Sequence, residues 1–187
     1  MSASGTPIAS TPTPVAADSI VIDLDGLSTM HAGEAATYDY DDPEPMLAFI
    51  EEVTGVPRAG EDILDPWGNG DVWGKSYRWD DITVTVLLDG PAHVTVESPT
   101  IGDAPVTVAG GVAVGSTRAE AVAAGAWDDW DADGDGVADS LGIDERPVED
   151  TQSLSRPGEV GRQYVALRLT GDTVTAIASP DNDFSDI

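Results

Sequence analysis

The amino-acid sequence predicts an α+β protein built from two related units in tandem, each with one helix and one antiparallel β-hairpin. Two segments, 82–98 and 164–179, alternate apolar with other residues on both sides of a glycine-containing turn, which is the pattern of a β-hairpin. A segment with helix start signals and an apolar face precedes each hairpin. A helix and an antiparallel hairpin in each half favour an α+β fold.

The two halves share landmarks at similar spacing, which indicates a duplication. Gly26 and Gly111 accompany the first strand pattern of each half and lie 85 positions apart. Pro99 and Pro180 end the two return strands within Ser-Pro pairs and lie 81 positions apart. The alternative is that two unrelated hairpins look alike. The predicted organisation is a tether at residues 1–18, a first unit at 19–103 and a second unit at 104–187.

Residues 1–18 predict a disordered tether, because small residues, Ser, Thr and Pro leave little to bury. The opening Met-Ser-Ala-Ser-Gly and its Thr/Pro linker resemble the start of mature bacterial lipoproteins, whose first residue is a lipidated Cys. The resemblance implies that Met1 replaces that Cys and that lipid anchors the protein at the cell surface. The alternative is an ordinary disordered N-terminus. Seven Arg against one Lys, with abundant Ala, Gly, Val and Asp, are typical of GC-rich bacterial genomes of the actinobacterial type.

The first unit opens with an apolar strand pattern at 20–24 and continues into a helix. Asp42 can cap this helix, Pro43 suits its first position, and Gly55 ends it. The hairpin of this unit then turns at Asp89-Gly90. The apolar face of the helix consists of Met46, Leu47, Ile50 and Val53.

The second unit opens with a strand pattern at 106–112, and Thr117-Arg118-Ala119-Glu120 then fits a capping box. We expect this helix to run to Trp127. The segment 112–122, with its strand, Gly turn and capped helix, resembles the repeat unit of β-lactamase inhibitory protein and related small lipoproteins. The resemblance implies a protein-binding or envelope role, although the chain has none of the inhibitory protein's cysteines.

The charge of the chain restricts its partners. Thirty-five Asp and Glu against eight Lys and Arg give a formal net charge of −27. Such a surface repels phosphate backbones and anionic lipids, so we expect no nucleic-acid partner and no membrane contact except through a lipid anchor. The two histidines, His31 and His93, have no neighbouring nucleophile, and no catalytic motif is present. The sequence therefore predicts a protein that is not an enzyme.

The strongest chemical signal is an aspartate-rich loop at 131–139, which reads Asp-Ala-Asp-Gly-Asp-Gly-Val-Ala-Asp. It resembles the calcium loops of the thrombospondin type 3, dockerin and EF-hand kinds. Alternate residues of a tight loop direct their carboxylates to one centre, and Ca²⁺ takes six to eight oxygen ligands. Gly136 stands where such a loop must turn sharply. The predicted cofactor is Ca²⁺, and the predicted ligands are Asp131, Asp133, Asp135, Asp139, the carbonyl of Val137, and Asp144.

The loop departs from the calcium-loop pattern at its twelfth position, where Gly142 stands in place of an acid. Asp144 is the first candidate to replace that acid, Glu145 is the second, and a water molecule is a third option. The loss of a bidentate carboxylate predicts weak affinity, nearer the 10⁻⁴–10⁻³ M typical of extracellular modules. The alternative is a solvated acidic loop without an ion.

A second candidate site is the stretch around Trp67 and Trp73, which is rich in Gly, Asp and Asn. Exposed indoles beside such residues can stack on sugar rings, although aromatic residues more often cover a small core. The sequence as a whole predicts a calcium-binding, extracytoplasmic binding or structural protein of the cell envelope, in which calcium orders the second unit. Its partner is an unidentified protein or glycan. The alternative function is an envelope carbohydrate-binding module that uses Trp67 and Trp73.

Overall fold

The structure is a computed structural model that describes residues 19–31, 34–65 and 68–184. The predicted tether at 1–18 lies outside these ranges, and so does Trp67. Of the described residues, 47% lie in strands and 13% in helices. The predicted α+β class, with two helix-plus-hairpin units in tandem, is therefore wrong, because the fold is mostly β and consists of one five-stranded and one eight-stranded sheet.

The five-stranded sheet has the order β3-β2-β1-β9-β8. The strands β1, β2 and β3 form an antiparallel meander, and β1 pairs in parallel with β9, so that Ile20 lies opposite Val106. This pairing joins a strand from the start of the chain to one beyond residue 103. The strand bounds are β1 Ser19–Ile22, β2 Gly26–His31, β3 Glu34–Asp39, β8 Thr100–Ile101 and β9 Ala104–Thr107.

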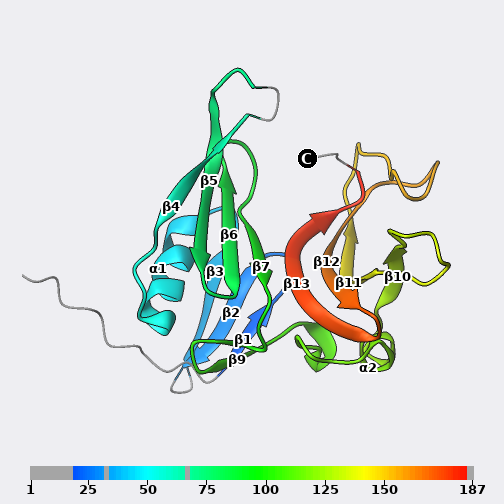
Figure 1. Ribbon diagram of the computed structural model, residues 1–187, viewed down its shortest axis with the longest axis horizontal. Coiled ribbons are helices and arrows are strands. Elements are labelled where there is room, and N and C mark those ends of the chain that lie inside the picture. The colour runs from blue at the N-terminus through cyan, green and yellow to red at the C-terminus, as the bar shows by residue number, and fades with distance from the viewer. Residues whose placement is uncertain (1–18, 32–33, 66–67, 185–187) are drawn as a thin grey trace, which may run out of the picture.

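The eight-stranded sheet has the order β10-β11-β12-β13-β7-β6-β5-β4 and is antiparallel throughout. Both predicted hairpins are confirmed, as β6–β7 and as β12–β13. They lie side by side in one sheet because β13 pairs with β7, and Figure 1 shows β13 curving through the middle of the molecule. The bounds are β4 Gly60–Leu64, β5 Val72–Trp79, β6 Ile82–Leu87, β7 His93–Val96, β10 Trp127–Trp130, β11 Ser140–Pro147, β12 Arg162–Thr170 and β13 Thr173–Asn182.

The first predicted helix is confirmed as α1, Pro43–Thr54. Gly55 ends it in the left-handed conformation at φ 67°, which glycine adopts without steric cost. Asp42 precedes the helix, but its side chain makes no capping hydrogen bond. The helix packs against β3, where the Phe49 and Tyr38 rings stack with centroids 4.4 Å apart.

The second predicted helix is shorter than expected. The capping box is confirmed: Thr117 and Glu120 exchange hydrogen bonds at the start of α2, Arg118–Ala123. The helix ends four residues before Trp127, which instead begins β10. The expected strand at 106–112 is β9 only as far as Thr107, and a short 3₁₀ turn, Ala109–Gly111, follows it.

One apolar core connects the two sheets and draws on both halves of the chain. Ile20 and Leu27 from the five-stranded sheet, Ile50 from α1, and Leu167 and Ile177 from β12 and β13 are all fully buried in it. Such a core excludes water from both sheets and is the main source of stability. A second, smaller cluster lies on the opposite face of the β12–β13 hairpin and consists of Tyr164, Ala166 and Ala178, with Trp127 packed against it.

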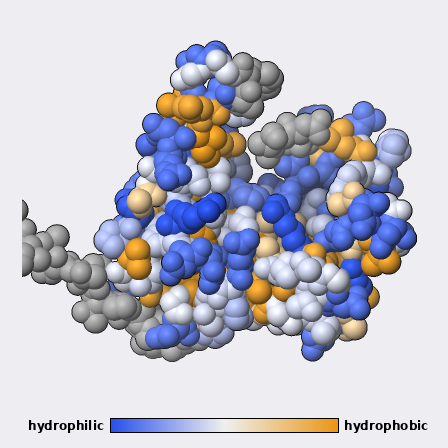
Figure 2. Space-filling view, in the orientation of Figure 1, coloured by the Kyte–Doolittle hydropathy of each residue, from blue (hydrophilic) through white to orange (hydrophobic). Residues whose placement is uncertain are grey.

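The outer surface is predominantly hydrophilic, as Figure 2 shows, with an apolar patch on the arm that carries β4 and β5. Leu64 and Val72, which pair across these strands, are 59% and 40% exposed. In the described ranges, both helices are too short and insufficiently apolar to cross a bilayer.

Candidate metal centre

The aspartate-rich segment forms the loop between β10 and β11, at the outer edge of the eight-stranded sheet (Figure 1). Backbone hydrogen bonds fix its end. The Asp139 amide donates to the Trp130 carbonyl at 2.7 Å, and the Leu169 amide donates to the Asp139 carbonyl at 2.8 Å. The loop is therefore tied both to the strand that precedes it and to β12.

Three of the predicted ligand side chains converge. Asp131, Asp133 and Asp139 each place one carboxylate oxygen so that the three oxygens lie within 4.8 Å of one another. Asp131 and Asp139 are partly buried and Asp133 is exposed. Three hard, anionic oxygens at this separation are the donor set that Ca²⁺ prefers.

Backbone amides hold Asp131 at the centre of the loop. The Gly134 amide donates to Asp131 Oδ1 at 2.7 Å and the Gly136 amide to Oδ2 at 2.9 Å. These hydrogen bonds, that from Gly136 foremost, lower the pKa of Asp131. Gly134 and Gly136 have φ of 75° and 91°, which residues with a side chain rarely adopt. The need for glycine at the turn therefore follows from the backbone.

Asp135 and Val137 lie in the same loop, outside the group of three carboxylates. Asp135 Oδ1 accepts a hydrogen bond from the Val137 amide at 2.7 Å. The Val137 side chain is 51% exposed, as expected for a position that would contribute only its carbonyl.

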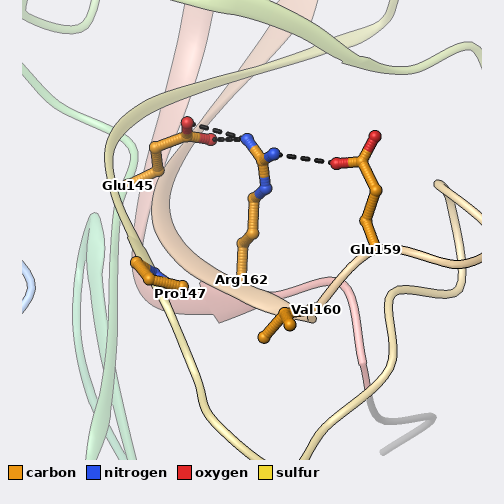
Figure 3. A pocket seen from close by; sticks show the side chains of 5 residues that line it. All are labelled: Glu145, Pro147, Glu159, Val160 and Arg162. Carbon is orange, nitrogen blue, oxygen red and sulfur yellow. Dashed lines mark hydrogen bonds and ion pairs between the residues drawn. The ribbon is translucent and has the colours of Figure 1, made fainter.

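The structure does not bring the twelfth-position candidates to the loop. Gly142 lies within β11 and pairs with Trp127. Asp144 is exposed at an irregularity farther along β11, at φ 56°, and four strand residues beyond Ser140 correspond to about 13 Å. Glu145 instead forms a two-oxygen ion pair with Arg162, with both N–O distances 2.8 Å (Figure 3).

Arg162 also pairs with Glu159 at 2.9 Å, so Figure 3 shows one guanidinium between two carboxylates. The Glu145 contact is the main cause of the raised pKa of Arg162. This arrangement satisfies the charge of Glu145 locally, and it explains why that carboxylate is not directed toward the aspartate loop.

Arg118 is a residue of the site that the sequence pattern did not reveal. Its guanidinium donates through Nη2 to the Ala138 carbonyl, within the aspartate loop. It also lies 3.6 Å from Asp128 and 3.4 Å from Asp172. Arg118 therefore connects α2, the loop and the β12–β13 turn, and no local spacing rule predicts such a tertiary contact.

A second acidic group lies beside the loop. The Tyr164 hydroxyl donates to Asp129 Oδ2 at 3.1 Å. Burial raises the pKa of Asp129, and the negative charge of nearby Asp181 raises it further. Burial is also the main cause of the raised pKa of Tyr164.

The structure describes one of the two tryptophans of the candidate glycan stretch. Trp73 lies on β5 and is partly buried. Its carbonyl accepts a hydrogen bond from the Leu88 amide at 2.9 Å. The predicted pairing of Trp73 with Trp67 falls partly outside the described residues and stays a prediction.

Comparison of the chain with known protein families, with curated proteins and with solved structures found no match. Three convergent carboxylates, a glycine turn and a carbonyl at the seventh loop position suit a hard divalent cation.

Proposed function

We propose that this protein binds one calcium ion at the 131–139 loop and acts outside the cytoplasm as a binding or structural protein of the cell envelope. The convergence of the Asp131, Asp133 and Asp139 carboxylates carries this proposal. Without a cation these like charges repel one another, and a bound Ca²⁺ removes that cost while ordering the loop.

The coordination shell suits calcium and implies weak binding. Three carboxylates and the Val137 carbonyl supply fewer oxygens than the six to eight that Ca²⁺ takes, so water completes the shell. Mg²⁺ demands a stricter octahedron and gives up its own waters reluctantly, which makes it the poorer occupant. An affinity of about 10⁻⁴–10⁻³ M fits a compartment where calcium is plentiful.

The ion would act on the position of β10 and β11. The loop joins the outermost strand of the sheet to its neighbour, and Arg118 holds its Ala138 carbonyl. Calcium would stabilise this edge and thereby the surface beside it. At a free calcium concentration of 100 times the dissociation constant, binding to the folded state alone would add about 2.7 kcal/mol to the free energy of unfolding.

Isothermal titration calorimetry of the protein with Ca²⁺ tests the proposal, with Mg²⁺ as the competing ion. We expect one site per chain, selectivity for Ca²⁺, and a melting temperature that falls when a chelator is added. An unchanged melting temperature in chelator and in excess calcium would rule out a structural ion.

The cell-surface location is a proposal of its own. The resemblance of the first residues to those of mature lipoproteins supports it, and a net charge of −27 suits a surface that attracts cations. Mass spectrometry of the N-terminus of the protein from its native host tests it, with a lipidated cysteine as the expected finding. An unmodified N-terminus there would contradict the lipid anchor but not the calcium site.

A further inference from the structure

A concavity of about 710 Å³ lies beside the aspartate loop, on the face of the sheet that carries Tyr164 and Arg168. Strands β10, β11, β12 and β13 and the connection around residues 154–155 all contribute to its lining. Asp139, whose carboxylate belongs to the candidate metal centre, forms part of its wall. The concavity therefore borders the metal centre and shares Asp139 with it.

An irregularity in β10 directs two neighbouring side chains into this concavity. Asp128 pairs with Leu141 and Trp130 pairs with Ser140, so Asp129 is an extra residue between them. In a regular strand, neighbouring side chains point to opposite faces. A bulge changes that alternation, and here both Asp129 and Trp130 line the concavity.

A second irregularity, in β13, supplies the opposite wall. Tyr164 pairs with Asp181, while Ala166 pairs with Ala178, so β13 has an additional residue between these pairs. The shift places Asp181 opposite Tyr164 in the strand pairing, and Asn182 follows it on the wall. Bulges are concentrated beside binding sites, because they redirect side chains.

The lining combines one aromatic platform with polar groups of both signs. Trp130 is 61% exposed, an unusual position for the largest apolar side chain. Around it lie the Asp129 and Asp181 carboxylates, the Ser140 hydroxyl and the Arg168 guanidinium. The carboxylates accept hydrogen bonds and the guanidinium donates them.

This chemistry matches a ligand that is flat and apolar on one face and carries hydroxyl groups around its edge. Sugar hydroxyls both donate and accept, so they can satisfy carboxylates and a guanidinium together. The C–H face of a sugar ring can cover an indole and remove its exposed apolar area from water. The lining has four aspartates and one arginine, so its excess negative charge disfavours an anionic ligand and leaves a neutral, hydroxyl-rich one as the better match.

We propose that this concavity is a saccharide-binding site, with Trp130 as the stacking platform and Asp129 and Asp181 as hydrogen-bond acceptors. The site differs from the glycan site predicted around Trp67 and Trp73, which lies on another part of the chain. Its ligand contacts do not require the metal.

The test is to titrate the full chain with three neutral tetrasaccharides and to monitor binding by NMR chemical shifts. The three sugars are cellotetraose, chitotetraose and mannotetraose. We expect at least one of them to bind, and Trp130→Ala to weaken that binding by about tenfold or more, the effect of losing one stacked ring. Trp130→Phe should retain part of the affinity. Leu88→Ala, which truncates a residue that is 74% exposed in the β6–β7 turn and does not line the concavity, serves as the control and should bind normally.

Repeating the titration in chelator separates this proposal from the calcium proposal. Saccharide binding that persists in chelator supports an independent site, whereas calcium binding by Trp130→Ala shows that the loop is intact. Two results would overturn the inference: no binding of any of the three sugars, or equal binding by Trp130→Ala.

Discussion

Asp133→Asn is the substitution that distinguishes a calcium loop from a solvated acidic loop, because its two expected effects have opposite signs. Without metal, Asp133 lies no more than 4.8 Å from two like charges, those of Asp131 and Asp139. Each pair of unit charges at that distance repels by about 0.9 kcal/mol in water, and physiological salt reduces this by roughly half, so the substitution relieves about 0.9 kcal/mol in all. Since 1 kcal/mol corresponds to about 2–4 °C in a chain of this size, the variant should melt about 2–4 °C higher in chelator.

With calcium in excess the order should reverse. An amide oxygen is a weaker ligand than a carboxylate, so the variant should lose part of the stabilisation of about 2.7 kcal/mol that the proposed calcium ion would give the wild type at 100 times its dissociation constant. That stabilisation corresponds to about 5–11 °C. The variant should therefore melt below the wild type in calcium.

Differential scanning fluorimetry of both proteins, in chelator and in calcium, provides the four melting temperatures. Asp89→Asn, an exposed aspartate in the β6–β7 turn, is the matched control and should follow the wild type in both buffers. If Asp133→Asn shifts the melting temperature in the same direction in both buffers, the three carboxylates do not share an ion and the reasoning fails.

Three further substitutions test the surroundings of the loop. Arg118→Ala leaves the buried Ala138 carbonyl without its charged donor and should cost about 1.5–3 kcal/mol in urea unfolding, while also weakening calcium binding. Gly142→Ala places a Cβ against the Trp127 ring, which packs between the Tyr164 ring and the Arg156 guanidinium and cannot easily move. This substitution should cost about 1–3 kcal/mol by the same assay. Asp129→Asn should raise the melting temperature at neutral pH in chelator, because burial and nearby charge raise the pKa of the native carboxyl.

The pH dependence of the last variant follows from linkage. A carboxyl whose pKa is raised on folding favours the folded state only while it is protonated. Its contribution is present below the unfolded pKa, about 3.9, and is lost as pH rises through the folded value. The advantage of Asp129→Asn, measured as the increase in melting temperature over the wild type, should thus grow from acid to neutral pH. An advantage that is constant with pH would contradict the raised pKa of Asp129.

For Arg118→Ala, the control is Arg78→Ala, which removes an exposed arginine on β5.

Local signals predicted local structure well. Pro43 and Gly55 mark the two ends of α1, Thr117 and Glu120 form the capping box of α2, and alternation located both hairpins. These features succeed because the atoms that stabilise them are neighbours in sequence. The carboxylates of the loop belong to the same category, since a nine-residue segment brings its own side chains together.

The sheet architecture was not predictable in the same way. β4 and β5 pair through residues such as Asp62 opposite Lys75, which have weak strand preference, so this region reads as a loop in sequence. The partners of β1 and β13, namely β9 and β7, are distant in sequence, and hydrogen bonds between backbones carry no signature of the side chains involved. The predicted fold class was therefore wrong, because strand pairings between distant parts of the chain determine it.

Asp144 illustrates the same limit within the candidate site. Its spacing from Asp139 would suit a loop that continues, but Ser140 already pairs with Arg168 and begins a strand. Once the chain is extended, each residue adds about 3.3 Å and carries its side chain away from the ion. The early start of β11 thus removes the twelfth-position ligand, and the same strand places Ser140 between Trp130 and Arg168 at the proposed saccharide site. The missing twelfth ligand of the proposed ion site and the position of Ser140 in the concavity are therefore two consequences of one strand boundary.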